Sequence, residues 1–97
     1  MVKNLKELSQ AVHSAKTAIE QEDIEKTLEV FEEFIDPKKC GERMIEQFFE
    51  EHREIRLWKI RLKDRGPDYL EENKKKMLTL FENIDATVTK SLRNEIA

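Results

Sequence analysis

The 97-residue sequence predicts an all-α fold, an antiparallel up-down four-helix bundle in one domain that spans residues 1–97. Apolar residues recur three and four positions apart, which is the spacing of one helix face. The chain holds only two Gly and two Pro, so few positions oppose helix formation. Both prolines, in Asp36-Pro37 and Gly66-Pro67, stand where a helix can begin but not continue. These two positions divide the chain into its helical segments.

Two short helices are predicted in the first third of the chain. The first begins at Asn4, which forms a capping box with Glu7. Its apolar stripe comprises Leu5, Leu8, Val12, Ala15 and Ile19. The next stripe comprises Ile24, Leu28, Phe31 and Ile35. Because the two stripes would point about 140° apart on one straight helix, we predict a turn at residues 21–22 and a second helix capped by Asp23.

A long third helix is predicted over residues 37–65, with Asp36 as its N-cap and Pro37 in its first turn. Its buried stripe comprises Cys40, Met44, Phe48, Ile55, Trp58 and Leu62. His52 and Ile45 lie at the margin of this stripe. We expect His52 to be partly buried and bonded to a neighbouring helix.

A long fourth helix is predicted over residues 68–96, opening with a capping box formed by Asp68 and Glu71. Its buried face comprises Leu70, Met77, Leu80, Phe81, Ile84, Val88 and Leu92. Short connections in this short–short–long–long pattern favour antiparallel neighbours. The acidic turn near Glu22 should then lie at the same end as the basic turn near Gly66. The alternative is a three-helix bundle with segments 4–35, 37–65 and 68–96.

The composition predicts a cytoplasmic protein that does not span a membrane. Cys40 is the only cysteine, which excludes an internal disulfide and suits a reducing compartment. No run approaches the roughly 20 apolar residues of a membrane span, and no apolar signal-peptide segment follows Met1. We expect Cys40 to act as a small buried apolar side chain.

The motifs predict no enzyme, no metal site and no cofactor. Metal sites in helical bundles use Glu-x-x-His pairs. Here Gln10 stands three residues before His13, and Phe49 stands three before His52. A single cysteine cannot supply the thiolate set of a zinc site, and no Gly-rich loop is present to hold a phosphate.

The net charge of −3 conceals an uneven distribution along the chain. Residues 20–51 include twelve acidic and four basic residues, whereas residues 52–76 include nine basic and five acidic ones. The basic stretch 53–76 is therefore a candidate nucleic-acid surface. Its phosphate contacts would be Arg61, Lys63, Arg65, Lys74, Lys75 and Lys76. Because acidic residues are interspersed and the bases surround the helix, we favour a solvated, salt-bridged surface.

Apolar residues outside the buried stripe predict a protein-binding face on the third helix. Phe49, Leu57 and Ile60 point away from that stripe. Arg53 and Arg56 lie between them, and aliphatic residues beside aromatics and Arg are typical of interfaces. We therefore predict a non-enzymatic helical interaction module, acting as an adaptor, chaperone-like binder or inhibitor. Its partner would be another protein or a second copy of the chain as a homodimer.

Other apolar residues lead to two further expectations. Val30 and Phe34 leave the stripe of the second helix, and Leu78 leaves that of the fourth. Each helix in a bundle touches two neighbours, so a wide apolar face absorbs some of these residues. The alternative of a small-ligand site inside the bundle depends on Met44, Trp58 and Met77.

Overall fold

Helices follow one another along nearly the whole described chain. The computed structural model describes residues 5–96 and contains no strand within them. The helices are α1 (Leu5–Glu20), α2 (Ile24–Ile35), α3 (Pro37–Cys40), α4 (Glu42–Gln47), α5 (Phe49–Arg65) and α6 (Pro67–Ile96). The all-α prediction is confirmed. No described helix combines the length and the apolar character that crossing a membrane requires.

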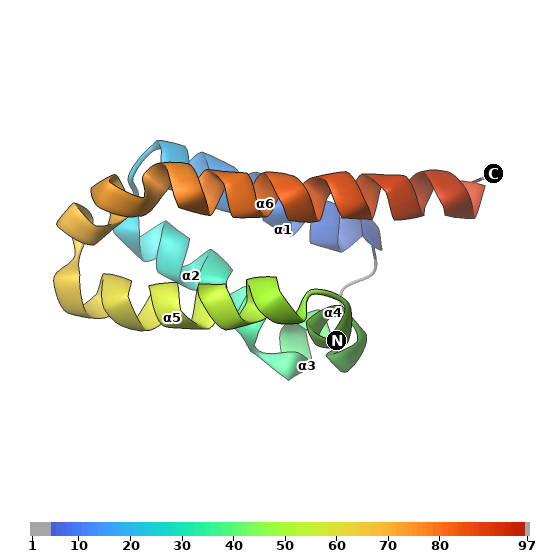
Figure 1. Cartoon of the computed structure of the whole chain (residues 1–97), viewed down its shortest axis with the longest axis horizontal. Coiled ribbons are helices and arrows are strands. Elements are labelled where there is room, and N and C mark those ends of the chain that lie inside the picture. Colours follow the sequence, from blue (N-terminus) through green and yellow to red (C-terminus); the bar gives the residue numbers. More distant parts are fainter. Residues whose placement is uncertain (1–4, 97) are drawn as a thin grey trace.

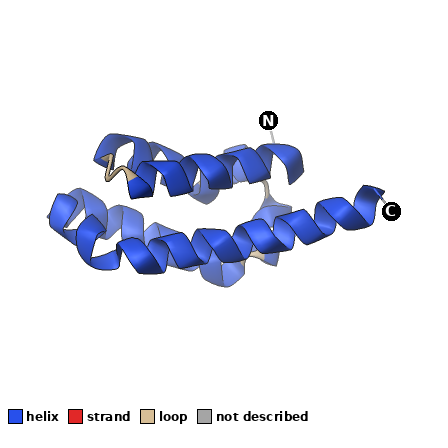
Figure 2. Ribbon diagram, turned by 90° about the horizontal axis from the view of Figure 1, so that it is seen from above, coloured by secondary structure: helices blue, strands red, loops and turns tan. Residues whose placement is uncertain are grey.

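The four longest helices contact one another in a closed order. α1 packs against α6 and α2, and α5 packs against α2 and α6, in a body 43 Å long (Figure 1). The α1–α2 and α5–α6 turns lie at the same end, as predicted. There Lys74 donates a 3.0 Å hydrogen bond to the carbonyl oxygen of Glu20, and its Nζ lies 3.8 Å from the Glu22 carboxylate. The C-terminal end of α6 extends past the other helices (Figure 2).

The predicted turn between the first two helices is confirmed. Glu22 has a φ of +55°, a left-handed conformation that ends α1. Asp23 then caps α2, because its carboxylate accepts a 3.1 Å hydrogen bond from the backbone N–H of Lys26. A continuous helix over residues 4–35, as in the three-helix alternative, is therefore wrong. The predicted N-cap Asn4 lies outside the described residues.

The prediction of one long helix over residues 37–65 is also wrong, because this segment is broken twice. Asp36 caps α3 as predicted, accepting a 3.0 Å hydrogen bond from Lys38 N–H. Gly41 then adopts a φ of 87°, which a glycine reaches at little cost and which ends the helix after one turn. Phe48, with φ −115° and ψ 46°, separates α4 from α5. The core-facing stripe is nonetheless as predicted, and its members are the buried Cys40, Met44, Phe48, Ile55, Trp58 and Leu62.

Aromatic side chains of three helices meet in the centre of the core. Phe31 of α2 stacks on Phe81 of α6 with ring centroids 5.9 Å apart, and Phe34 meets Phe81 edge-on at 5.3 Å. Trp58 of α5 lies 6.2 Å from Phe31. Contacts of this kind favour offset or edge-to-face geometry and stabilise the helix pairs that they join.

The predicted buried face of α2 is right for Phe31, which is fully buried, and wrong for its other members. Val30 and Phe34, expected to leave the stripe, are 3% and 1% exposed. Ile24, Leu28 and Ile35, expected to be buried, are only partly buried against the core. The reason is that α2 lies between α1 and α5, so its most buried side lies between two neighbours instead of following the best single stripe.

The start of α6 differs by one residue from the prediction, and its buried face is as predicted except at Leu80. The side chain of Leu92 lies outside the described residues. The helix begins at Pro67, so the expected N-cap Asp68 lies within its first turn. Leu80 and Leu78 are only partly buried and pack against the core. The fully buried members are Leu70, Met77, Phe81, Ile84 and Val88.

Candidate functional site

The outward side of α5 carries the large apolar side chains that stay exposed in the described chain. Phe49, Leu57 and Ile60 are 59%, 41% and 63% exposed. With Arg53 and Arg56, both exposed, they follow helical spacing along one side. We call these five residues the outer α5 face. With a rotation of 100° per residue around the helix axis, this face points about 180° away from the buried Ile55, Trp58 and Leu62.

The ends of α5 explain how this face is held outward. Phe48, at the break before α5, is buried, whereas Phe49, the first residue of α5, is exposed. At the other end, Gly66 adopts φ 73° and ψ −146°, a region that is essentially restricted to glycine. Its N–H caps α5 by donating to the carbonyl oxygen of Leu62 at 2.8 Å. Both ends of the helix are therefore fixed by backbone geometry.

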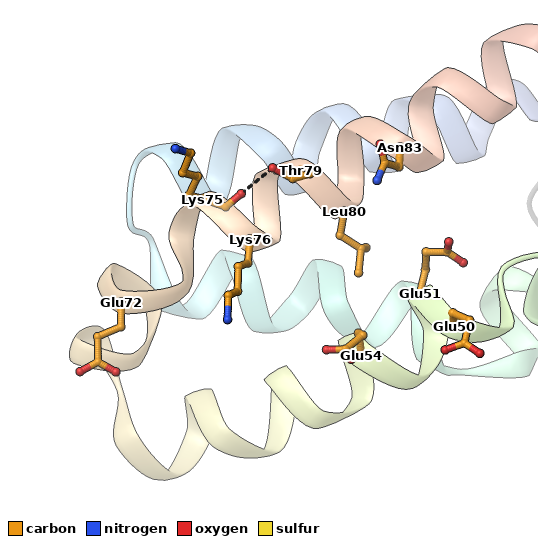
Figure 3. Close-up of a pocket in the computed structure, with 9 residues that line it drawn as sticks. All are labelled: Glu50, Glu51, Glu54, Glu72, Lys75, Lys76, Thr79, Leu80 and Asn83. Carbon is orange, nitrogen blue, oxygen red and sulfur yellow. Dashed lines mark hydrogen bonds between the residues drawn. The ribbon is translucent and has the colours of Figure 1, made fainter.

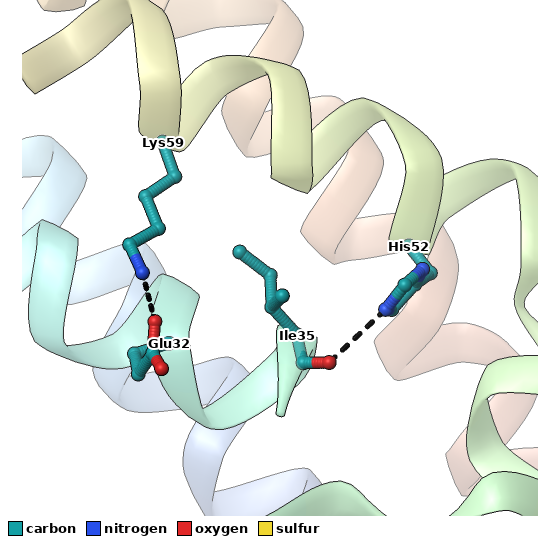
Figure 4. A network of polar contacts seen from close by, with 4 residues as sticks. All are labelled: Glu32, Ile35, His52 and Lys59. Atoms are coloured by element: carbon teal, nitrogen blue, oxygen red, sulfur yellow. Dashed lines mark hydrogen bonds and ion pairs between the residues drawn. The ribbon is translucent and has the colours of Figure 1, made fainter. Parts of the chain in front are cut away.

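Polar groups on the inner side of α5 have partners on α2, as Figure 4 shows. Lys59 forms an ion pair with Glu32. His52 Nε2 lies 3.2 Å from the carbonyl oxygen of Ile35 and acts as the donor, since a carbonyl only accepts. The expectation of a partly buried histidine bonded to a neighbouring helix is confirmed. His13, in contrast, is exposed on α1.

Arg53 and Arg56 on the outer α5 face differ from these inner groups. Neither guanidinium makes a hydrogen bond or an ion pair with any residue that the structure describes. Both keep all their donors available, in the fork geometry that matches carboxylates. The outer α5 face therefore combines exposed apolar surface with two unused positive charges.

The candidate nucleic-acid residues gather around the α5–α6 turn, but two of them already bind acidic partners. Arg65 donates to the Glu72 carboxylate at 2.9 Å and lies over the ring of Tyr69, 5.3 Å from its centroid. Lys74 is held by the α1–α2 turn, at Glu20 and Glu22. The remaining four, Arg61, Lys63, Lys75 and Lys76, are exposed. A nucleic-acid role remains a prediction, and two of the six basic side chains predicted to contact phosphates already have partners within the chain.

A groove of about 650 Å³ runs between α5 and α6 (Figure 3). Its α5 wall carries Glu50, Glu51 and Glu54, and its α6 wall carries Lys75 and Lys76. The remaining lining residues are Glu72, Thr79, Leu80 and Asn83. Nothing local in the sequence indicates that these glutamates line a groove together with lysines of another helix.

The residues behind the other chemical hypotheses are mostly in the core. Met44, Trp58 and Met77, which suggested a small-ligand site, are all buried. Cys40 is buried as expected, and its thiol lies 3.3 Å from the carbonyl oxygen of Asp36. Within residues 5–96, no cluster of three or more His, Cys, Asp or Glu side chains is arranged to hold a metal ion.

Comparisons with known proteins gave no match to this chain. No protein-family model matches it, and neither a curated protein nor a solved structure does so. The side chains of the outer α5 face are therefore the basis for the proposal that follows.

Proposed function

We propose that this chain is a non-enzymatic helical interaction module that binds another protein through the outer α5 face. One observation carries the proposal: the three large exposed apolar side chains, Phe49, Leu57 and Ile60, share one side of one helix. Single scattered exposed apolar residues need no explanation, whereas several large ones on one side of one helix indicate an interaction surface. Such a module serves as an adaptor, chaperone-like binder or inhibitor in the cytoplasm.

The proposal gives the rest of the chain a supporting role. In it, α1, α2, α5 and α6 act as an antiparallel up-down four-helix bundle that holds α5 rigid. Rigid support lowers the entropic cost of binding, because fewer side chains and backbone angles must be ordered on contact. The exposed apolar area of the three side chains is on the order of a few hundred Å². That area suits a transient partner better than a permanent one.

The experiment compares the wild-type chain with a variant whose patch is made acidic. Leu57→Asp with Ile60→Asp adds two negative charges to the outer α5 face. The matched control, Ala86→Asp with Thr87→Asp, adds the same charge at exposed positions of α6. Each protein is used for sedimentation velocity and for affinity capture from the native source.

We expect the wild type and the α6 control to retain a partner, either another protein or a second copy, that the α5 variant loses. The wild type and the two variants are expected to show the same helical circular dichroism, since the substituted positions are exposed. Monomers that capture nothing in every case, or a captured partner that the α5 variant keeps, would contradict the proposal.

A further inference from the structure

We propose that the partner of the outer α5 face is an acidic amphipathic helix, whose carboxylates pair with Arg53 and Arg56 while its apolar residues meet Phe49, Leu57 and Ile60. This inference rests on the proposed function and names the chemistry of the partner. The recognition mode is an amphipathic helix that lays its apolar stripe along a complementary surface.

The first argument is the order of residues along the face. The apolar positions lie at its two ends, at Phe49 and at Leu57 and Ile60, with the arginines between them. Phe49 and Ile60 are eleven residues apart, so the face is about 17 Å long, or three helical turns. A partner helix of similar length with apolar ends and acidic residues in the middle would match both its shape and its charge.

The second argument is that the two arginines are unused, while other cations of α5 are engaged. Lys59 pairs with Glu32 and Arg65 pairs with Glu72. Arg53 and Arg56 have no such partner among the described residues. Burying them against an apolar partner would remove their hydration without replacement, at a large cost. A partner with carboxylates opposite these two guanidinium groups therefore forms the more stable complex.

The third argument is that a second copy of the chain does not meet this requirement. Arg53 lies four residues after Phe49, and Arg56 lies four residues before Ile60. In an antiparallel two-fold pairing that places Phe49 against Ile60, Arg53 consequently faces Arg56 of the second copy. A parallel two-fold pairing places each arginine against its own equivalent. Both arrangements gather four positive charges at the centre of the contact.

One shifted register relieves that repulsion but gives up part of the apolar contact. Antiparallel pairing of Leu57 with Ile60 brings Arg53 opposite Asp64 of the second copy. Phe49 then lies beyond the end of the facing α5, which stops at Arg65. Because none of these three two-fold arrangements satisfies the charges and the apolar residues together, the observations favour a different protein with acidic residues.

The test uses two designed helical peptides labelled with a fluorophore. Both carry apolar residues at positions i, i+8 and i+11; one has Glu at i+4 and i+7, and the other has Lys there. Binding to the full chain is measured by fluorescence anisotropy at about 0.05 M and about 0.5 M salt. Sedimentation velocity and flotation with phosphatidylglycerol–phosphatidylcholine vesicles are run in parallel.

Three variants separate the contributions of charge and apolar contact. Arg53→Glu with Arg56→Glu reverses the charge of the outer α5 face. Lys75→Glu with Lys76→Glu makes the same change in net charge at exposed positions of α6, away from that face. Leu57→Ser with Ile60→Ser removes apolar surface and leaves the charges unchanged.

We expect the wild type to bind the Glu peptide about tenfold more tightly than the Lys peptide at low salt, with a smaller ratio at high salt. The arginine variant should reverse this preference, and the lysine control should keep it. The serine variant should lose affinity for both peptides, since apolar contact supplies much of the binding.

Several outcomes would overturn the inference, and one of them spares the proposed function. The wild type could bind both peptides with equal affinity, and the serine variant could lose that binding. This result would support the outer α5 face as the binding surface and reject its selectivity for acidic partners. If Lys75→Glu with Lys76→Glu changes the preference for the Glu peptide as much as the arginine variant does, the attraction is general and not specific to the outer α5 face. No binding of either peptide, vesicle binding that replaces peptide binding, or a dimer that excludes the peptide each rejects an acidic helix as the partner.

Discussion

The two faces of α5 carry similar side chains but meet different surroundings. The inner face contains Ile55, Trp58 and Leu62, all buried against α2 and α6, and cationic Lys59 paired with Glu32. The outer face contains comparable apolar residues and two arginines, all exposed and without described ion pairs. α5 therefore carries two apolar stripes, one facing the core and one facing outward. Basic side chains accompany both: Lys59 on the inner face and the two arginines on the outer face.

The comparison teaches that apolar content alone does not decide burial. Stability comes from surface that is removed from water on folding, which only the inner face provides. Leaving Phe49, Leu57 and Ile60 in water forgoes that stabilisation, and an exposed apolar patch also favours aggregation. A partner that covers the outer α5 face would resolve both consequences. The predictions below test how differently the two faces behave.

The largest expected difference is between two isoleucines on opposite sides of α5. Ile55 is fully buried and Ile60 is 63% exposed. Ile55→Ala should lower the free energy of unfolding by about 2–5 kcal/mol, whereas Ile60→Ala should change it by less than about 0.5 kcal/mol. Urea unfolding followed by circular dichroism measures both. If Ile55→Ala fails to fold, Ile55→Val, with an expected loss of about 0.5–1.5 kcal/mol, replaces it. Equal losses at both positions would mean that the outer face is packed as well.

A smaller difference is expected between the two histidines. His52 donates to the carbonyl oxygen of Ile35 across the α2–α5 contact, and His13 is exposed on α1. His52→Ala should cost about 0.5–1.5 kcal/mol, because a net hydrogen bond is lost. His13→Ala should have nearly no effect on thermal or urea unfolding. If His52→Ala leaves the free energy of unfolding unchanged, this hydrogen bond does not stabilise the contact between α5 and α2.

The smallest expected effect concerns the cations of the two faces. A double-mutant cycle with Lys59→Met and Glu32→Gln should give a coupling energy of at most about 1 kcal/mol, since the pair is partly exposed. The coupling should shrink at about 1 M salt, where charges are screened. Arg56→Met in place of Lys59→Met provides the control and should show no coupling to Glu32. Coupling of equal size in both cycles would indicate a general charge effect instead of a specific pair.

The sequence predicted much of the fold because the relevant signals are local. The turn before Asp23 followed from two apolar stripes that disagree on one straight helix, and the structure confirms it. The break at Gly41 had a local signal as well, since glycine commonly ends helices, but the prediction of one long helix did not use it. The break at Phe48 had none, because phenylalanine does not mark a helix end.

The candidate site was predicted in part for the same reason. The exposure of Phe49, Leu57 and Ile60 follows from their angle relative to the buried stripe of the same helix, and it is confirmed. Their binding role stays a prediction. The groove between α5 and α6 was missed, because it depends on residues that are far apart in the sequence, such as Glu54 and Lys76.

The sequence by itself determined the helical segments before and after α3 and α4, and the side of α5 that stays exposed. Both depend on the 3.6-residue repeat, which acts within a few turns of one helix. Only the tertiary structure decided that Phe34 is buried while Ile24 and Leu28 lie at the margin of the core. It also decided that Lys59 is paired while Arg56 is not. The physical reason is that burial and ion pairing depend on where neighbouring helices lie, and no single helix carries that information.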